Sequence, residues 1–309
     1  MKHTSKLIIR QEHCDPQVEI NVGNEVYAVT FSANGEYLLS GGQGRVQVWQ
    51  VKDGTQVATM DPAECVLCLA VSNDGRWIAA GTLFGDVLVW DAETYEQVFT
   101  HGEDSRDILG VDFSPDSTRL VSASDNCTAS IWDVPTRKRV HTLDHKHGPV
   151  CAAKYSPHGD RIATASFNSI RVWDSRNGRL LMDINVGVTP LYNSGLLWSN
   201  NNLFAISGSK IKQLDASTEL VVSEWSVPDS GYRSCIALSK HGEFITYSAN
   251  HTVTFWDTSS HTQLGHIQLH PQDICSTALS PGDGLIAVGE ERGVIVRRIS
   301  RIIVSFLSL

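Results

Sequence analysis

The sequence contains no long hydrophobic run and no excess of positive charge. No apolar stretch approaches the roughly 18 residues that a membrane-spanning helix requires. The start of the chain reaches charged side chains after a short apolar run at residues 7–9, unlike a secretion signal. Lysine and arginine number 25 against 34 aspartate and glutamate residues, giving a net charge of −9 that repels phosphate backbones and anionic membranes. We therefore expect a cytoplasmic chain, with a nuclear location left open, that has neither a membrane nor nucleic acid as its default partner.

Cysteine follows no pairing pattern. The 7 cysteines are an odd number and are scattered along the chain, which argues against a disulfide framework. Cys65 and Cys68 have CxxC spacing, but they lie in an apolar alternating stretch. Residues three apart in a strand point to opposite faces and cannot easily share a metal ion or a disulfide. The sequence predicts small, reduced, mostly buried thiols.

Catalytic motifs are also missing. The sequence has no nucleophile elbow, no HExxH helix and no phosphate-binding loop. The run Gly41-Gly42-Gln43-Gly44 joins two predicted strands and opens no helix, so it predicts a hairpin turn. His141, His145 and His147 lie close together in sequence, but no second ligand group is fixed by spacing, and we expect solvated loop histidines. We assign no catalytic residue, no metal and no cofactor.

A repeat runs through the whole chain. A short strand ending in serine is followed by a turn every 40 to 43 residues. A second register, at the end of another apolar strand, keeps step with it at intervals of 41 or 42 residues. The first register comprises Ser32, Ser72, Ser114, Ser156, Ser199, Ser239 and Ser280, and the second comprises Trp49, Trp90, Trp132, Trp173, Leu214, Trp256 and Arg297.

Each copy predicts a four-stranded antiparallel meander. Short runs rich in Val, Ile, Leu and aromatic residues are separated by Asn-Gly, Asp-Gly and other Gly-rich turns. The middle runs are apolar at almost every position, so both faces of the inner strands must be covered. A single blade of about 41 residues cannot bury its own faces, whereas seven blades packed around an axis cover one another. The sequence therefore predicts an all-β, seven-bladed β-propeller.

Four copies close the third strand with Trp-Asp, at Trp90-Asp91, Trp132-Asp133, Trp173-Asp174 and Trp256-Asp257, and Ser-Pro-Asp-like turns occur at Ser114-Pro115-Asp116 and Ser156-Pro157-His158. These features resemble the WD-repeat propellers over about residues 18 to 307. We expect the repeated Trp and Asp residues to serve packing and turn formation, because every blade must pack and turn in the same way, whereas a partner does not contact every blade alike.

The resemblance implies one propeller domain over residues 1–309. Two segments compete to close the ring, Gln17–Ile20 and Ile302–Phe306, and we favour the first, pairing with the third strand of the last blade. The expected blades are 24–62, 63–104, 105–146, 147–189, 190–228, 229–270 and 271–309, with the closing strand from 17–21.

Departures from the family pattern are expected to change what holds the blades together. In the family, a Gly-His before the first strand and an Asp between the second and third strands form a buried hydrogen-bond network with Ser or Thr and the Trp. Here His147-Gly148 is reversed, and Phe84 and Asn168 are among the residues that replace the turn Asp. We therefore expect cohesion mainly from apolar packing. The fifth blade, which lacks the Trp, should be the least regular.

The resemblance also implies where partners bind. WD-repeat propellers commonly bind peptides on the narrow face, at the starts of the innermost strands and at the turns between the second and third strands. Here these positions combine acids with Tyr, Phe and Leu, which suits a partner with a basic residue and an apolar anchor. The candidate rim residues are Glu25, Tyr27, Leu67, Phe84, Asp107, Leu109, Asp125, Phe167, Tyr192, Tyr232 and Asp273.

The predicted function is a non-catalytic scaffold that binds a protein or peptide partner, as a monomeric propeller within a hetero-complex. One alternative is an enzyme or small-molecule binder with a pocket at the channel mouth, lined by Tyr27, Tyr192 and Tyr232. A second alternative is an RNA-associated subunit, which the net charge disfavours. A deep pocket with an acid/base pair would favour the first alternative, and a continuous basic stripe would favour the second.

Overall fold

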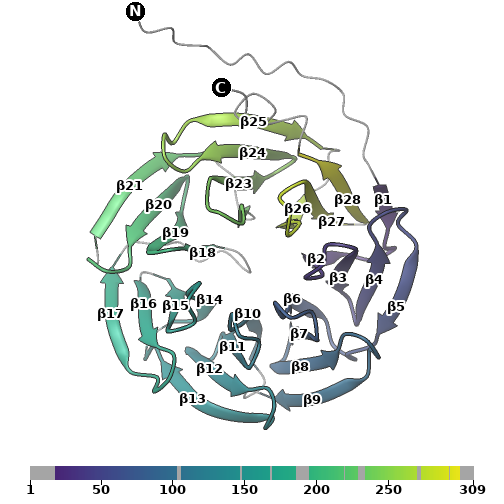
Figure 1. Ribbon diagram of the computed structural model, residues 1–309, viewed down its shortest axis with the longest axis horizontal. Coiled ribbons are helices and arrows are strands. Elements are labelled where there is room, and N and C mark those ends of the chain that lie inside the picture. The colour runs from purple at the N-terminus through teal and green to yellow at the C-terminus, as the bar shows by residue number, and fades with distance from the viewer. Residues whose placement is uncertain are drawn as a thin grey trace, which may run out of the picture.

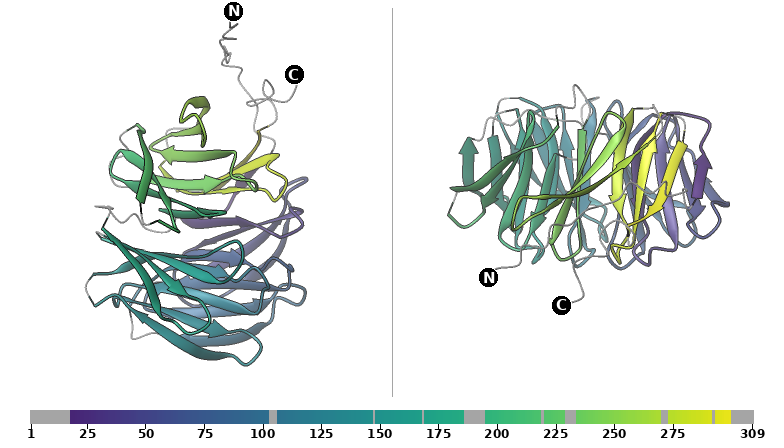
Figure 2. Two further views of the ribbon diagram at one scale, coloured as in Figure 1. Left: turned by 60° about the vertical axis from the view of Figure 1, so that its left-hand side comes forward. Right: turned by 90° about the horizontal axis from the view of Figure 1, so that it is seen from above.

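Seven four-stranded antiparallel sheets stand around a central axis (Figure 1). The right-hand view of Figure 2 shows the ring from its side. The described residues form 28 strands and no helix, so this part of the chain has no helix long and apolar enough to cross a membrane. The prediction of an all-β, seven-bladed propeller is confirmed. The computed structural model describes residues 18–102, 106–146, 148–167, 169–185, 195–218, 220–228, 234–269, 273–291 and 293–299.

Each blade contributes one strand to the axis and three further strands outward. The innermost strands of blades 1 to 7 are β2 (Val26–Phe31), β6 (Val66–Val71), β10 (Ile108–Phe113), β14 (Val150–Tyr155), β18 (Leu196–Ser199), β22 (Ser234–Leu238) and β26 (Ile274–Leu279). The second strands are β3 (Tyr37–Gly42), β7 (Trp77–Thr82), β11 (Arg119–Ser124), β15 (Arg161–Ser166), β19 (Asn202–Ser207), β23 (Phe244–Ala249) and β27 (Leu285–Glu290).

The remaining strands build the outer half of each blade. The third strands are β4 (Arg45–Gln50), β8 (Asp86–Asp91), β12 (Thr128–Asp133), β16 (Ser169–Asp174), β20 (Lys210–Asp215), β24 (Thr252–Asp257) and β28 (Gly293–Arg298). The outermost strands are β5 (Gln56–Met60), β9 (Gln97–Gly102), β13 (Lys138–Asp144), β17 (Leu180–Asn185), β21 (Leu220–Ser226), β25 (Gln263–Gln268) and, in blade 7, β1 (Val18–Asn21).

The ring is closed by the N-terminal side of the chain. Strand β1 pairs antiparallel with β28, with Val18 opposite Val296 and Asn21 opposite Gly293. The last blade thus combines the first strand of the chain with three late strands, which leaves no open seam between blades 7 and 1 (Figure 1). The competing segment, Ile302–Phe306, lies outside the described residues.

The serine register has a local cause. In the turn between the first and second strands, the serine hydroxyl accepts a hydrogen bond from the backbone N–H at the start of the second strand. This bond fixes the turn and explains why the serine recurs. Its donor–acceptor distances are 3.0 Å for Tyr37–Ser32, 2.9 Å for Trp77–Ser72, 2.9 Å for Arg119–Ser114, 3.0 Å for Arg161–Ser156, 3.0 Å for Phe244–Ser239 and 3.0 Å for Leu285–Ser280.

The aspartate of each Trp-Asp pair organises the next turn. Asp133 accepts hydrogen bonds from the hydroxyl of Thr136 at 2.5 Å and from its backbone N–H at 2.8 Å. These two bonds lower the pKa of the Asp133 carboxyl. Asp91 binds the N–H groups of Glu93 and Thr94 in the same way. The aspartates therefore act as turn residues, as the sequence predicts.

The hydrophobic core lies between blades. One cluster combines Val87 and Val89 of blade 2 with Val111, Leu120 and Trp132 of blade 3. Equivalent clusters fill the other seams, so the inner strands are covered on both faces. This burial is the main source of stability for a chain built from sheets that cannot fold singly.

Some blades keep a buried hydrogen bond to the tryptophan of the third strand. Three of the third-strand tryptophans donate their indole N–H to a buried hydroxyl on the neighbouring second strand. These bonds retain part of the family network even though the turn Asp is missing, and they add to the apolar packing that the sequence predicts as the main source of cohesion. The pairs are Trp49–Ser40 at 2.8 Å, Trp132–Ser122 at 2.9 Å and Trp173–Thr164 at 2.7 Å.

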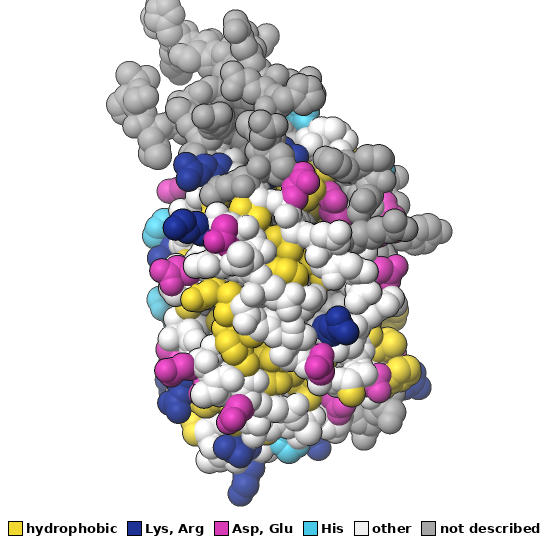
Figure 3. Space-filling view, turned by 90° about the vertical axis from the view of Figure 1, so that its right-hand side faces the viewer, with side chains coloured by type: hydrophobic (Ala, Val, Ile, Leu, Met, Phe, Trp, Pro, Cys, Tyr) yellow, Lys and Arg dark blue, Asp and Glu magenta, His cyan; other side chains and the backbone are white. Residues whose placement is uncertain are grey.

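Antiparallel order sorts the connections onto two faces of the ring. The innermost strands start on one face, which also carries the turns between second and third strands; we call this face the upper face. The lower face carries the turns between first and second strands and those between third and outermost strands. Figure 3 shows the outer side near β1 and β5, where apolar groups lie among acidic and basic side chains of mixed sign.

Candidate functional site

Bulges shape the mouth of the channel on the upper face. The pairing between the first two strands shifts by one residue at the second position of five innermost strands. A bulge leaves one residue unpaired and changes the direction of its side chain. The residues at these bulges are Tyr27, Leu67, Leu109, Cys151 and Cys275.

Acidic side chains of blades 1 to 3 gather beside the entrance of β6. Burial first, and then the charges of Glu25, Glu64 and Asp107, raise the pKa of the Cys65 thiol. Carboxylates from three different blades therefore lie near enough to this half-buried cysteine to act on its thiol. Asp125 is joined to this group because its backbone N–H donates to the carbonyl of Asp107 at 2.9 Å. We call Glu25, Glu64, Asp107 and Asp125 the acidic rim.

An exposed aromatic side chain, Phe84, and a partly exposed one, Tyr27, lie beside these acids. The backbone N–H of Phe84 donates to the carboxylate of Asp107 at 3.5 Å, and the Phe84 side chain is 60% exposed. Phe84 also has a φ of +80°, a left-handed conformation that is uncommon for a bulky residue. Tyr27 donates its hydroxyl to the carboxylate of Glu25. The acidic rim thus combines negative charge with apolar surface.

One cation partly balances the acidic rim. The guanidinium of Arg106 lies 3.6 Å from the carboxylate of Asp125, and its side chain is exposed. Sequence reasoning did not select Glu64 or Arg106, because both lie in loops between blades and outside the strand-start pattern. Their position next to Cys65 and Asp107 in sequence was the available signal.

The other candidates do not form one site. Leu109 is only 2% exposed, so its assignment as a contact residue is wrong. An apolar side chain at a bulge gains free energy by turning away from water, and sequence position does not reveal that choice. Leu67 is half-buried, and Phe167 is 48% exposed in blade 4 beside Gly148. Asp273 is exposed in blade 7, and Tyr192 and Tyr232 lie outside the described residues.

The central channel holds a cavity of about 710 Å³ between the innermost strands. Lys154 and Asp112 form an ion pair across blades 3 and 4, with 2.9 Å between Nζ and Oδ1. Asp112 also accepts the backbone N–H of Tyr155 at 2.8 Å, which fixes the carboxylate in place. Burial raises the pKa of Cys68, which also lines the cavity, to about 12. This thiol stays protonated at neutral pH and is a poor nucleophile.

Comparison with known proteins places the chain in a family. Residues 25–297 match the family model described as the IFT122 first beta-propeller. The chain belongs to this family of WD-repeat β-propellers. Autophagy-related protein 16 of Arabidopsis thaliana is 26% identical over 249 residues, which cover 75% of this chain and 47% of that protein. WD repeat-containing protein SL1-17 of Schistosoma mansoni is 32% identical over 104 residues, covering 33% of this chain and 34% of that protein.

These matches span less than half the length of either relative. A chain in the crystal structure of the mitotic checkpoint complex superposes on this propeller with a TM-score of 0.79 and 19% identity. The superposition covers 95% of this chain and 97% of the other. At that identity, the likeness establishes the shared fold alone.

Two of the clustered histidines of this WD-repeat propeller form contacts between blades. His141 Nε2 lies 2.9 Å from the carbonyl oxygen of Arg176 in blade 4. His145 is 1% exposed, and its Nε2 lies 2.7 Å from Thr164 Oγ1. The prediction of solvated loop histidines is therefore wrong for His145, while His147 lies outside the described residues. Across the described part of the chain, no group of three His, Cys, Asp or Glu residues could hold a metal ion.

The described cysteines, Cys14 being outside this part of the chain, all carry free thiols. Cys68 is buried, and its thiol lies 3.4 Å from the carbonyl oxygen of Ile108 in the next blade. Cys65, by contrast, is half-buried on the acidic rim. The two residues of the CxxC motif therefore have separate surroundings, as expected for a strand.

Proposed function

We propose that this propeller is a non-catalytic scaffold that binds a protein or peptide partner at the acidic rim. The partner carries a lysine or arginine together with an apolar anchor. The observation that most supports this is the convergence of Glu25, Glu64 and Asp107 around Cys65, with the exposed ring of Phe84 alongside. Cationic and apolar contacts can therefore be made within one small area of the upper face.

Electrostatics and stiffness both favour binding at this surface. Solvated carboxylates of one sign create a negative potential that attracts a basic segment and increases its association rate. The acids sit on strand ends and short turns of a closed ring, so little conformational entropy is lost when a partner docks. Modest contacts at the acidic rim are then sufficient for specific binding.

The scaffold is proposed to act within a hetero-complex in the cytoplasm or nucleus. The structural neighbour from the mitotic checkpoint complex is itself a propeller within a protein assembly, and that supports the same use here. A surface of mixed charge around β1 and β5 (Figure 3) and the net charge of −9 make nucleic acid a weaker candidate partner. The protonated Cys68 thiol likewise offers no support for a catalytic channel.

The test compares two triple charge reversals in the full chain. The rim variant carries Glu25→Lys, Glu64→Lys and Asp107→Lys. The control variant carries Glu36→Lys, Glu96→Lys and Glu243→Lys, which reverse three exposed acids of the lower face. Both variants change the net charge equally, so a general loss of negative charge affects them alike.

Partners are captured from the native cell extract with the wild type and both variants, and co-purifying chains are quantified by mass spectrometry. A direct partner identified in this way is then titrated with each variant. The proposal predicts a loss of affinity of at least about tenfold for the rim variant and little change for the control. Equal binding by the wild type and the rim variant would place the interaction elsewhere.

A further inference from the structure

Arginine side chains close two seams between blades on the lower face. Arg119, the first residue of β11, donates from Nη1 to the carbonyl of Ser175 in blade 4 at 2.7 Å. Arg161, the first residue of β15, donates in the same way to Ala216 in blade 5 at 2.9 Å. In both seams the acceptor directly follows the aspartate that ends the third strand. Two of the seven blades therefore use the first residue of the second strand to place a guanidinium group against the next blade; the other five blades have Tyr37, Trp77, Asn202, Phe244 and Leu285 at this position.

The seam between blades 1 and 2 has the same backbone but lacks the arginine. Tyr37 is the first residue of β3, the position that Arg119 and Arg161 occupy in their own blades. Ala92 directly follows Asp91 and takes the acceptor position. Among the described residues, no donor reaches the carbonyl of Ala92. A groove of about 630 Å³ remains between the two blades, and both Tyr37 and Ala92 line it.

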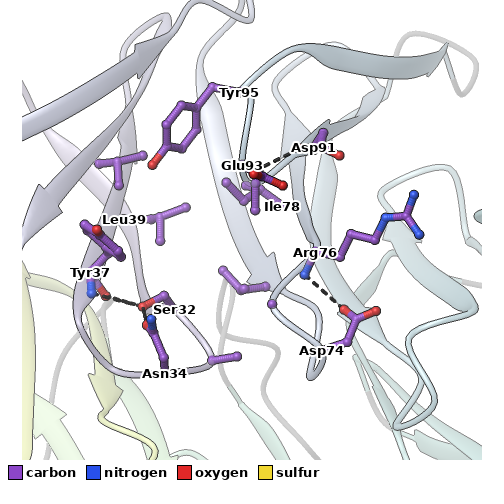
Figure 4. A pocket seen from close by; sticks show the side chains of 15 residues that line it. Ser32, Asn34, Tyr37, Leu39, Asp74, Arg76, Ile78, Asp91, Glu93 and Tyr95 are labelled. Atoms are coloured by element: carbon purple, nitrogen blue, oxygen red, sulfur yellow. Dashed lines mark hydrogen bonds between the residues drawn. The ribbon is translucent and has the colours of Figure 1, made fainter.

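The groove presents aromatic, apolar and acidic side chains (Figure 4). Tyr37 and Leu39 line its blade 1 side, while Ile78 and Glu93 line its blade 2 side. Tyr95 lies close to Tyr37: burial first, and then the neighbouring Tyr37, raise the pKa of the Tyr95 hydroxyl. Two phenol rings and a carboxylate are therefore available to one ligand.

The charge of the groove favours a cation. Asp74, Asp91 and Glu93 line it together with one cation, Arg76. The guanidinium of Arg76 is directed away from Tyr37 (Figure 4) and lies over the ring of Trp77, 4.6 Å from its centroid. The carboxylate of Asp91 already binds the backbone of its own turn, whereas Glu93 is exposed and extends toward the groove.

We propose that this groove binds the arginine side chain of an extended segment of a partner protein. The guanidinium takes the position that Arg119 and Arg161 occupy in their seams. It donates to the carbonyl of Ala92, pairs with Glu93 and stacks against the tyrosine rings. Lysine is a poorer ligand because it lacks the planar group that can donate and stack together. The groove lies on the lower face and is independent of the acidic rim.

A substitution copied from blades 3 and 4 tests whether the groove binds an arginine side chain. Tyr37→Arg places in the chain the same residue that closes the seams at Arg119 and Arg161, and it should fill the groove from within. Tyr37→Phe keeps the ring and removes only the hydroxyl. Glu93→Gln removes the counter-charge and leaves the groove open. Thermal melting of each full-length variant establishes that it folds.

Random peptides displayed on phage are selected on the wild type and then depleted on Tyr37→Arg. A recovered peptide is synthesised with its arginine intact, replaced by lysine and replaced by citrulline, and its binding is measured by fluorescence anisotropy. We expect citrulline to weaken binding by at least about tenfold, and Glu93→Gln by several-fold. Tyr37→Phe should change affinity by less than about threefold, and the triple rim variant should bind as the wild type does.

Several results would overturn the proposal. Recovered peptides without arginine, or equal binding of the arginine and citrulline peptides, would show that the groove does not recognise a guanidinium. Equal binding to the wild type and Tyr37→Arg would place the peptide elsewhere. Binding that appears only after residues 1–17 are removed would make the chain's own N-terminal segment the occupant, in place of a partner. Should Tyr37→Arg fail to fold, Glu93→Gln and the citrulline peptide decide the outcome.

Discussion

His145 and Thr164 are joined across the seam between blades 3 and 4, with 2.7 Å between Nε2 and Oγ1. The same threonine oxygen accepts the indole N–H of Trp173 at 2.7 Å. The carbonyl of His145 accepts a hydrogen bond from Arg171, which also pairs with Asp183. A histidine from one blade thus completes a buried polar chain in the next.

This geometry makes stability depend on pH. Burial first, and then the charge of Arg171, lower the pKa of His145 from 6.5 to about 4. Below pH 6.5 the unfolded chain binds a proton that the folded chain excludes, so stability present above that pH is lost as the pH falls toward 4. The slope is about 1.4 kcal/mol per pH unit from this residue. Urea denaturation of the wild type and His145→Gln between pH 7 and 4.5 measures it.

His158→Gln serves as the control, because His158 is exposed. It should keep the wild-type slope, while His145→Gln should flatten it. Parallel curves for all three proteins would mean that His145 is protonated equally in the folded and unfolded chains.

Trp132 should be a stability residue and not a binding residue. Its side chain is 2% exposed, its indole N–H donates to Ser122 at 2.9 Å, and the ring of His101 stacks on it at 4.7 Å. Trp132→Ala should cost about 3–5 kcal/mol because it leaves a large cavity in the core between blades 2 and 3. Calorimetry and partner binding are measured together. An unchanged melting temperature with lost binding would reverse the assignment.

Charge reversal of Asp107 and Asp273 should slow association more than it speeds dissociation. Both acids lie on the upper face, where they act on a basic partner mainly before contact. Because Asp107 belongs to the acidic rim and Asp273 stands apart in blade 7, Asp107→Lys alone should have the larger effect. Surface plasmon resonance at several salt concentrations resolves the rates. Indifference to both salt and charge reversal would show that the partner does not bind this face.

Gly42 allows the backbone at Glu25, part of the acidic rim, to approach closely because it has no Cβ. A Cβ added at this position would lie 1.9 Å from the carbonyl oxygen of Glu25, so the strand entrance would have to move. Gly42→Ala should cost about 1–3 kcal/mol and displace Glu25, weakening a basic partner. Gly282→Ala is the control, because a Cβ there meets nothing within 4 Å. Denaturant unfolding compares them, and equal stability would mean that the close approach relaxes freely.

The sequence predicts the features that recur in every blade. It does not predict contacts that occur at only one boundary between two blades. The serine turns and Trp-Asp turns follow from local hydrogen bonds, so they recur and can be recognised by period. His145 directly follows the last strand of blade 3, outside the strand positions that repeat, so the period of the sequence does not reveal that it is buried. Leu109 occupies the same strand position as the partly exposed Tyr27, and only packing separates them. The groove at Tyr37 becomes visible only when the structure shows what Arg119 and Arg161 bind.

Blade 5 should be the least protected against amide exchange. Its inner strand β18 has 4 residues where β10 and β14 have 6, and its third strand carries Leu214 in place of the tryptophan. Leu214 cannot donate the hydrogen bond that ties Trp132 to Ser122. With fewer ladder bonds and no such tie, local opening of blade 5 costs less free energy. Hydrogen–deuterium exchange read by mass spectrometry should show peptides from β18 and β19 exchanging before those from β10 and β11. Equal or slower exchange in blade 5 would mean that burial against blades 4 and 6 outweighs the lost bonds.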